Sequence, residues 1–485
     1  MKPTLCRSVL LAGAFVLALA GCSTLGAPRS VSAPTPVQWF APLPHQGTLT
    51  DLTQWWQQQG DPLLVELIAS AQAVSPSIAS ARSRIEQSRA ARVSAGAALL
   101  PTLDAAASIS RSPLQPSGGP GSAPIATTGQ LGLQAGWEID VFGGKHASRD
   151  AASERFSGAQ AQWHDARVSV AAEVANQYYS LRTCRQLDAI TRADAASRQE
   201  TARLTELSTR AGFTAPATAA LARASAAEAR GRATQQAAQC ELDTKALVAL
   251  SGLSEPDLKQ KVALAGVEYT QVAIISIANL PADALAQRPD LFSAEREVAA
   301  ASADLGSAQA QRYPRLSLNG SIGGSRVRVG GVSTDLSTWS IGPLALSLPI
   351  FDGGRRAANV DAAQARYEEA AALYRARVRQ AVREVETALV NLQSTADREG
   401  DAQTAAAGYR ESFTGTEARY QNGLASLVEL EDARRSQLGA QTTLASLQQA
   451  RMTAWVSLYR AMGGGWTPAL DQPGHGVSVA QPNGL

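Results

Sequence analysis

The chain repeats its own pattern once, about 210 residues further along. Five landmarks recur in the same order in the two copies, and the offset within each pair, such as 423 − 212 = 211, stays close to that value. The pairs are Pro101 and Pro314, Gly143 and Gly353, Glu173 and Glu384, Gly212 and Gly423, and Gly252 and Gly463. Solenoid repeats are only about 20–50 residues long, so each copy here is a unit of domain size. The fold must therefore contain two similar halves.

The first 22 residues have the pattern of an export signal. Lys2 and Arg7 precede an apolar stretch, Val9 to Ala20, which is shorter than the roughly 20 residues of a membrane-spanning helix. Cys22 follows Leu-Ala-Gly and looks like the cysteine of a bacterial lipobox, which would be diacylated and become the mature N-terminus. Ser23 rather than Asp comes next, a pattern usual for export to the outer membrane. The alternative is an ordinary signal peptide in which Cys22 falls there by chance.

The composition excludes several classes of protein. The formal net charge is only 44 − 42 = +2 and no block of like charge stands out, so nucleic acid is not an expected partner. No apolar run after residue 22 is long enough for a transmembrane helix. Aromatic residues make up 5% of the chain and alanine is abundant, which is typical of long, closely packed helices.

The first copy contains two segments that alternate as strands do. From Gln130 to Val141 apolar residues such as Leu131 and Trp137 alternate strictly with polar residues and glycine. Thr102–Arg111 alternates more weakly. The loop between them, residues 112–127, is rich in proline, glycine and serine. We therefore expect a hairpin that has one apolar face, one polar face and a long polar tip.

Helical periodicity occupies the rest of the first copy. A helix that begins near Pro76 is stopped by Pro101. After Gly144 apolar residues recur every three or four positions until about Arg210, a helix of roughly 96 Å at about 1.5 Å per residue. The chain turns near Gly212 and returns as a second helix to about Leu250. Because so long a helix cannot bury itself in one small domain, we interpret it as a coiled-coil arm.

The second copy repeats this plan with small departures. A strand is expected at 316–323, followed by a glycine-rich polar loop that continues through Gly330 and Gly331 to Ser337. A second strand is expected at 339–350, and its apolar phase switches at Pro343, where we expect a bulge or bend. The helices of this copy are expected at 289–312, at 357–420 and from Gly423 to Met462.

Four two-faced strands point to a membrane protein that is completed by other copies of itself. Strands of roughly 10 residues cross a bilayer as tilted β-structure. Four strands cannot close a barrel, and an open edge in lipid leaves backbone groups unsatisfied at several kcal/mol each. The polar faces would line a water-filled lumen, and the long helices would extend this lumen into the periplasm.

A series of short motifs carries a resemblance to a known family. They are Arg288-Pro289-Asp290, Ala294-Glu295, Tyr313-Pro314, Phe351-Asp352-Gly353-Gly354-Arg355, Glu384-Val385-Glu386, Arg419-Tyr420-Gln421-Asn422-Gly423 and Gly463-Gly464-Gly465-Trp466. Each motif is weak by itself, but their order and spacing over about residues 50–466 are specific. Together they resemble the TolC-like outer membrane factor family, and the lipobox places the resemblance in its NodT-type lipoprotein branch.

The resemblance implies both an architecture and a function. The fold would be an α+β membrane protein, a homotrimer whose four strands per chain form a twelve-stranded β-barrel that continues into a long periplasmic α-helical coiled-coil barrel. The protein would be a passive exit duct for drugs or other small toxic compounds, opened by docking to a periplasmic adaptor (membrane fusion) protein and an inner-membrane RND transporter. Outer membrane lipid would surround the barrel. Type I protein secretion uses the same family of ducts and stays open as an alternative, and a structural coiled-coil envelope lipoprotein is a further one.

The duplication and the resemblance divide the chain into six segments. These are a lipoprotein signal peptide, 1–21; a lipidated N-terminal extended segment, 22–60; a first efflux repeat, 61–254; a linker or equatorial segment, 255–280; a second efflux repeat, 281–466; and a C-terminal tail, 467–485.

By position, the resemblance places the adaptor-docking tips at the two helical turns. Relatives often carry an acidic residue just after the second tip glycine, which forms a ring at the tunnel mouth, whereas this chain has Leu424 there. The tips are Ala211, Gly212, Phe213 and Thr214, and Asn422, Gly423, Leu424, Ala425 and Ser426. The nearest acids, which are candidates for the tunnel mouth, are Glu429, Glu431 and Asp432.

Two cysteines are placed symmetrically about the first helical turn. The midpoint of Cys184 and Cys240 is (184 + 240)/2 = 212, the turn glycine, so they lie at the same height in an antiparallel hairpin. Both fall on apolar seams, and the periplasm is oxidising. We predict a disulfide between them; the alternative is two buried free thiols that act as small hydrophobic residues.

No motif in the sequence indicates catalysis. The four histidines, His45, His146, His164 and His475, form no metal-binding spacing such as HExxH. The Gly-Gly pairs before the long helices lack the Lys-Ser/Thr of a phosphate loop, and a strand-to-helix turn explains them better. We therefore expect no enzymatic activity, no cofactor and no metal.

Overall fold

The computed structural model describes residues 26–36, 38–41, 54–113, 124–265 and 285–466 of the 485. The chain divides into two compact units, which we describe separately. The strand unit comprises Met1–Ser32, Arg84–Ala159 and Ser293–Arg375. The hairpin unit comprises Ala33–Ser83, Gln160–Phe292 and Ala376–Leu485. The predicted lipobox and the C-terminal tail lie outside the described residues.

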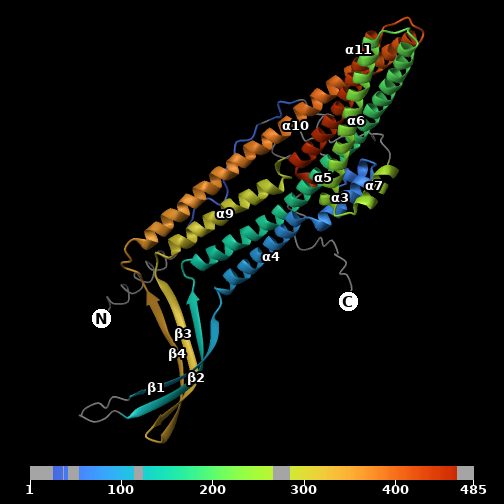
Figure 1. The fold of residues 1–485 in the computed structure, drawn as a ribbon. Coiled ribbons are helices and arrows are strands. Elements are labelled where there is room, and N and C mark those ends of the chain that lie inside the picture. The colour runs from blue at the N-terminus through green and yellow to red at the C-terminus, as the bar shows by residue number, and fades with distance from the viewer. Residues whose placement is uncertain (1–25, 37, 42–53, 114–123, 266–284, 467–485) are drawn as a thin grey trace. The chain divides into compact units, whose positions relative to one another are not determined.

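The helices repeat with the offset seen in the sequence (Figure 1). The two long helices α5 and α10 have 67 residues each and begin 355 − 144 = 211 residues apart. Each is followed by a shorter helix, α6 or α11, and each copy opens with a helix of 22 residues, α4 or α9. Their bounds are α4 Pro76–Ala97, α5 Gly144–Arg210, α6 Pro216–Ser251, α9 Pro289–Ala310, α10 Arg355–Gln421 and α11 Leu427–Ala461. The expected helices are therefore present, with ends shifted by a few residues.

The strand unit contains a four-stranded antiparallel sheet in the order β1-β2-β3-β4. The strands are β1 Thr102–Pro113, β2 Ile125–Ile139, β3 Arg315–Val329 and β4 Val332–Ser347. Strands from the two copies meet in the middle, where β2 pairs with β3 (Figure 1). Within the described chain β1 and β4 are the edges of this sheet.

The register gives the sheet one apolar and one polar face. Directly paired residues of an antiparallel sheet point to the same side. A row is a set of residues paired across the four strands. On the apolar face one row contains Ala105, Leu133, Ile322 and Trp339, and the next contains Leu103, Ala135, Gly320 and Ile341. The rows of the other face carry hydroxyl and amide groups; one of them contains Asp104, Gln134, Ser321 and Ser340. The large apolar side chains are exposed, Ile341 at 84% and Trp339 at 75%. The two-faced strands predicted from alternation are confirmed.

Two of the glycines on the polar face are required because the backbones of neighbouring strands approach each other closely there. Gly132 and Gly323 are paired across β2 and β3. A Cβ atom on Gly323 would lie 2.8 Å from the carbonyl oxygen of Leu131 and 3.0 Å from the Cα of Gly132. Any side chain at position 323 would therefore force the two strands apart.

The prediction for the second hairpin was partly wrong. The polar loop expected up to Ser337 is instead strand, and β3 and β4 are joined by a two-residue turn at Gly330 and Gly331. Both glycines have positive φ, 56° and 89°, which a tight hairpin turn requires and which glycine adopts without strain. The loop prediction failed because glycine and polar residues outnumber valine and leucine in residues 324–337, a composition that also fits a loop. The bulge expected at Pro343 is confirmed by a register shift opposite it, between Leu318 and Gly320.

The core of the hairpin unit lies where two short helices pack against α5, α6 and α11. We did not predict these helices, α3 Pro62–Val74 and α7 Glu255–Leu264, nor the single turn α2 Trp55–Gln58. Trp55 is 1% exposed and stacks on Tyr459 with ring centroids 5.1 Å apart. Other fully buried side chains of this core are Leu64, Leu67, Tyr178, Leu247, Leu258 and Leu389.

Three residues from the family motifs meet near this core. Arg288 forms ion pairs with Asp290 at 2.9 Å and with Glu384 at 2.8 Å, and it donates to the carbonyl oxygen of Ala461 at 2.9 Å. Burial alone would raise the pKa of Asp290, but the hydrogen bonds and charge of Arg288 outweigh burial and hold that pKa below its usual value. The motif therefore joins the start of α9 to α10 and to the end of α11.

Among the described residues no single helix is long and apolar enough to cross a membrane. The pair α3 and α4, bent by 50°, meets that criterion together by length and composition.

Candidate functional site

The ends of the two helical hairpins lie together in the hairpin unit (Figure 1). Near the turns the hydroxyl of Thr205 on α5 lies 3.1 Å from that of Tyr420 on α10. A small apolar cluster there joins both hairpins and contains Ala202, Ala222, Ala226, Leu427 and Leu430, with Phe413 and Tyr420 packed against it. The two predicted docking tips therefore form one surface of the chain.

The first tip is a glycine-ended helix followed by proline. Gly212 has φ +83°, the left-handed conformation that ends helices, and the N–H of Phe213 donates to the carbonyl oxygen of Ser208 at 2.9 Å. Pro216 then begins α6, because the first helical position needs no N–H donor. The ring of Phe213 is 86% exposed at the end of the hairpin.

The second tip has the same turn but a stronger helix start. Gly423 has φ +72°, and the N–H of Leu424 donates to the carbonyl oxygen of Arg419 at 2.8 Å. Ser426 and Glu429 then form a reciprocal capping box at the start of α11, with N–H to carboxylate and N–H to hydroxyl distances of 2.6 and 3.2 Å. Leu424 is 69% exposed and is the counterpart of Phe213.

The three candidate tunnel-mouth acids lie in different environments. Glu429 belongs to the capping box, and the hydrogen bond from the backbone of Ser426 lowers its pKa. Asp432 is exposed and lies 3.3 Å from Arg435. Glu431 is only 8% exposed and turns inward between the hairpins. Each acid therefore has a partner within its own chain.

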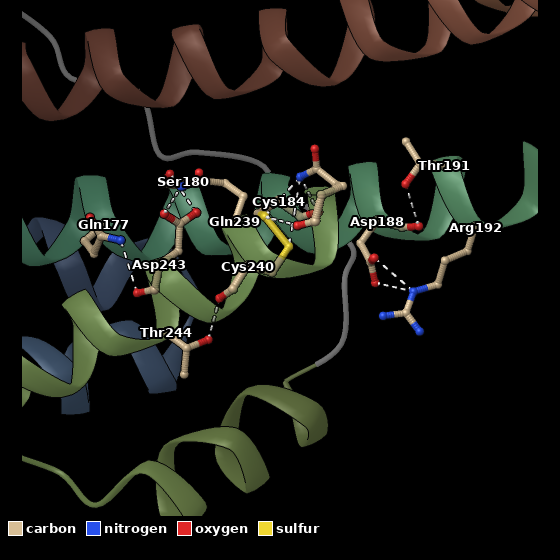
Figure 2. The surroundings of a disulfide bond; sticks show 11 residues. Gln177, Ser180, Cys184, Asp188, Thr191, Arg192, Gln239, Cys240, Asp243 and Thr244 are labelled. Carbon is tan, nitrogen blue, oxygen red and sulfur yellow. Dashed lines mark hydrogen bonds and ion pairs between the residues drawn. A yellow bond between two sulfur atoms is a disulfide. The ribbon is translucent and has the colours of Figure 1, made fainter. Parts of the chain in front are cut away.

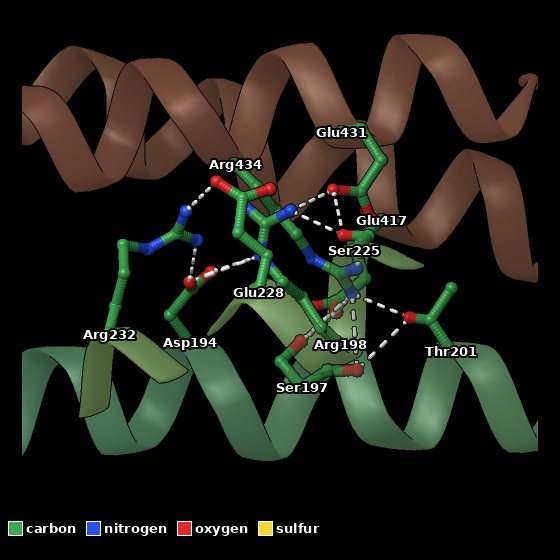
Figure 3. A network of polar contacts seen from close by, with 10 residues as sticks. All are labelled: Asp194, Ser197, Arg198, Thr201, Ser225, Glu228, Arg232, Glu417, Glu431 and Arg434. Atoms are coloured by element: carbon green, nitrogen blue, oxygen red, sulfur yellow. Dashed lines mark hydrogen bonds and ion pairs between the residues drawn. The ribbon is translucent and has the colours of Figure 1, made fainter. Parts of the chain in front are cut away.

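Glu431 is the centre of a buried polar network that joins α5, α6 and α11 (Figure 3). Its carboxylate accepts hydrogen bonds from Arg198 on α5, from Ser225 on α6 at 2.8 Å and from Arg434 on α11 at 3.0 Å. The side chains of Arg198 and Arg434 are 8% and 2% exposed. Removing one member of such a group leaves the remaining buried charges less well compensated, so the network favours one arrangement of the hairpins.

Further contacts attach the arginines to α5. Arg434 donates to the hydroxyls of Thr201 at 2.7 Å and Ser197 at 2.9 Å (Figure 3). Arg198 also pairs with Asp194, at 2.9 Å. The charged groups on both sides are thus shared between the hairpins, and separating the hairpins would break several charge-assisted hydrogen bonds at once.

We did not predict this network, although the sequence carries a signal for it. The apolar seam of α5 runs in steps of three and four through Val170, Val174, Tyr178, Leu181, Cys184, Leu187 and Ile190. The same steps continue to Asp194, Arg198, Thr201 and Thr205, where the seam becomes polar. Polar residues at buried seam positions of long helices indicate a specific polar contact rather than a simple core.

Cys184 and Cys240 are joined by a disulfide in the structure (Figure 2). Their Cα atoms are 5.5 Å apart, one on α5 and the other on α6. Cys184 is 4% exposed, and the hydroxyl of Thr244 donates to the carbonyl oxygen of Cys240 at 2.7 Å. The bridge therefore links the two helices of the first hairpin at one height.

In the described ranges, no cluster of three or more His, Cys, Asp or Glu side chains could hold a metal ion.

Comparison with known proteins gives concordant matches. The family model described as "Outer membrane efflux protein" matches residues 67–253 and 280–464. The chain is 30% identical to the solvent efflux pump outer membrane protein SrpC of Pseudomonas putida, over 93% of this chain and 97% of that protein. It is also 30% identical to the outer membrane protein OprJ of Pseudomonas aeruginosa, over 96% and 97%. The solved outer-membrane channel OprN is 26% identical and superposes with a TM-score of 0.78 over 92% of this chain and 97% of that one.

Proposed function

The chain belongs to the outer membrane efflux protein family, and we propose that three copies of it form the exit duct of a tripartite efflux system. It is an outer membrane channel that extends into the periplasm, as the resemblance in sequence predicted. In this proposal the duct is passive, and an inner-membrane RND pump supplies the energy for drugs or other small toxic compounds to leave the cell.

The observation that carries the proposal is the two-faced sheet, whose two edges pair with no other strand among the described residues. Its apolar face suits lipid and its polar face suits water. The unpaired backbone groups of β1 and β4 would be costly in a bilayer unless another copy of the chain paired with each edge. Three copies of four strands give twelve, an even number within the range of bacterial barrels.

The location of the protein in the outer membrane and periplasm supports two further inferences, about the N-terminus and about the disulfide. We infer that Cys22 is diacylated and anchors the mature chain, 22–485, to the outer membrane, and that Cys184 and Cys240 are oxidised in the periplasm. Residues 61–254 and 281–466 would then each supply one efflux repeat, with 255–280 as the equatorial linker.

The hairpin ends are the proposed docking surface for the periplasmic adaptor. Phe213 and Leu424 supply exposed apolar side chains at the two tips. Docking would favour an open duct only if the adaptor bound the separated hairpins more tightly than the joined ones. The network around Glu431 is the contact that such separation would have to rearrange.

Drug susceptibility tests this proposal. Deletion of the gene should raise susceptibility to several unrelated drugs, and the wild-type gene should restore resistance. Phe213→Asp with Leu424→Asp should fail to restore it, because the charges disrupt an apolar docking surface. Leu264→Asp, at a residue that is 81% exposed on α7, is the matched control and should restore it. Unchanged susceptibility together with lost secretion of a protein would favour a type I secretion duct instead.

A further inference from the structure

The apolar face of the sheet ends in charged residues near the hairpin tips. Five successive rows, from the one with Ile139 to the one with Leu131, consist of apolar residues, glycine and a single serine. The next row contains Ile109, Gly129, Arg326 and Asp335, and the row after it contains Arg111, Thr127, Arg328 and Ser333. The change from apolar to charged is therefore abrupt, and the charged residues lie on β1, β3 and β4.

The height of the apolar rows matches the interior of a membrane. Rows on one face are two residues apart, about 6.6 Å, so the four intervals between five rows extend about 26 Å along the strands. With a strand tilt of about 40° they span about 20 Å, close to the roughly 25 Å apolar band of membrane barrels. The arginine row thus lies at the level of lipid headgroups. Because the long helices extend into the periplasm, the hairpin tips and this row lie on the outer side.

Two of the three arginines there have uncompensated charge. Arg326 binds Asp335 with two hydrogen bonds of 2.6 and 2.7 Å, so this pair is neutral overall. Arg111 and Arg328 are exposed and form no ion pair with any described residue. The loop between β1 and β2, residues 114–123, contains no Asp or Glu in its sequence, so it offers no acid either.

The spacing of these residues suits a phosphate-bearing headgroup. Arg111 and Arg328 lie in one row, separated by Thr127 on the intervening strand, so their backbones are about 10 Å apart. Guanidinium groups bind phosphate oxygens with paired, charge-assisted hydrogen bonds. The hydroxyls of Thr127 and Ser333 in the same row are further donors.

We propose that Arg111 and Arg328 form a binding site for a phosphorylated glycolipid of the outer leaflet, of the lipid A type with two phosphates. This rests on the proposed function, since it requires the apolar face to contact lipid. The site would anchor each chain of the trimer at the outer headgroup level, opposite in the membrane to the acyl anchor at Cys22.

Thermal unfolding of the purified full-length protein in detergent tests this site. Bisphosphorylated lipid A should raise the midpoint for the wild type, and lipid A without phosphates should not. Arg111→Gln with Arg328→Gln should weaken the apparent affinity at least tenfold, while Arg111→Lys with Arg328→Lys should retain most of it. Arg326→Gln with Asp335→Asn is the matched control, because it removes a charged pair on the same face without changing net charge, and its response should equal that of the wild type.

Several outcomes would overturn this inference. An unchanged response of the double glutamine variant would do so, and so would an equal response of the wild type to lipid A without phosphates. An equal midpoint shift with phosphatidylglycerol would refute the assignment to a glycolipid. The efflux proposal is tested by a different measurement, the drug susceptibility of the deletion strain. The double glutamine variant should still restore drug resistance there, so loss of lipid binding and failure of the efflux proposal can be told apart.

Discussion

Glu431→Gln should make the duct open more readily. The substitution keeps the shape of the side chain but removes the charge shared by Arg198 and Arg434. Both arginines keep a second carboxylate nearby, Asp194 at 2.9 Å and Glu417 at 3.5 Å. The loss should therefore be smaller than the 3–5 kcal/mol of a fully orphaned buried charge, about 2–3 kcal/mol. If the separated hairpins do not make this contact, the ratio of open to closed duct rises roughly 30- to 150-fold.

Single-channel recording in planar bilayers measures this ratio directly. We expect a higher open probability for Glu431→Gln than for the wild type at the same voltage and salt. Glu228→Gln is the matched control, because Glu228 is an acid on α6 with an exposed side chain (70%) whose partner, Arg232, lies on the same helix. The reasoning fails if Glu431→Gln, folded and assembled as the wild type is, shows the same open probability. It also fails if the control opens as much.

Three further predictions concern stability. Replacing Cys184 and Cys240 by serine should lower the thermal midpoint, since closing a loop over a separation of 56 residues accounts for about 4 kcal/mol of chain entropy; an equal midpoint with and without reductant would contradict this. Ser426→Ala should cost about 1 kcal/mol and speed amide hydrogen exchange in the first turn of α11 but not of α6. The pKa of Asp165 is raised above its unfolded value, first by burial and then by the charge of Asp290. The protonated carboxyl therefore stabilises the fold at low pH, and this stability is lost as the pH rises through the folded pKa. Asp165→Asn should therefore raise the thermal midpoint at pH 7, with the difference disappearing below about pH 4, the ordinary pKa of an Asp side chain.

The elements that could be predicted are those whose pattern is local. The strict alternation at 130–141 gave strand β2 with its apolar side, and Gly212 and Gly423 gave both helical turns. The prediction failed where local chemistry was ambiguous. Residues 324–337 are polar and contain glycine, which fits a loop as well as the outer end of a strand, and only pairing with a neighbouring strand makes them β-structure.

The charged contacts of the hairpin ends depend on partners that are distant in the chain. Arg198 and Glu431 are 233 positions apart. Ser426, three residues before Glu429, is the local signature of a capping box, but nothing near Glu431 in the sequence indicates that its carboxylate is buried between helices. Their different roles depend on which surface of α11 packs against α5.

The sequence by itself therefore determined the duplication, the two-faced strands, the long helices, their turns and the family. Each of these depends on a period or a glycine that acts within a few residues, and the order of the motifs identified the rest. Only the tertiary structure decided which charges are buried, which arginines on the sheet stay uncompensated and where the second hairpin turns. Those properties are set by partners on other elements, because the free energy of a charge depends on what surrounds it in space.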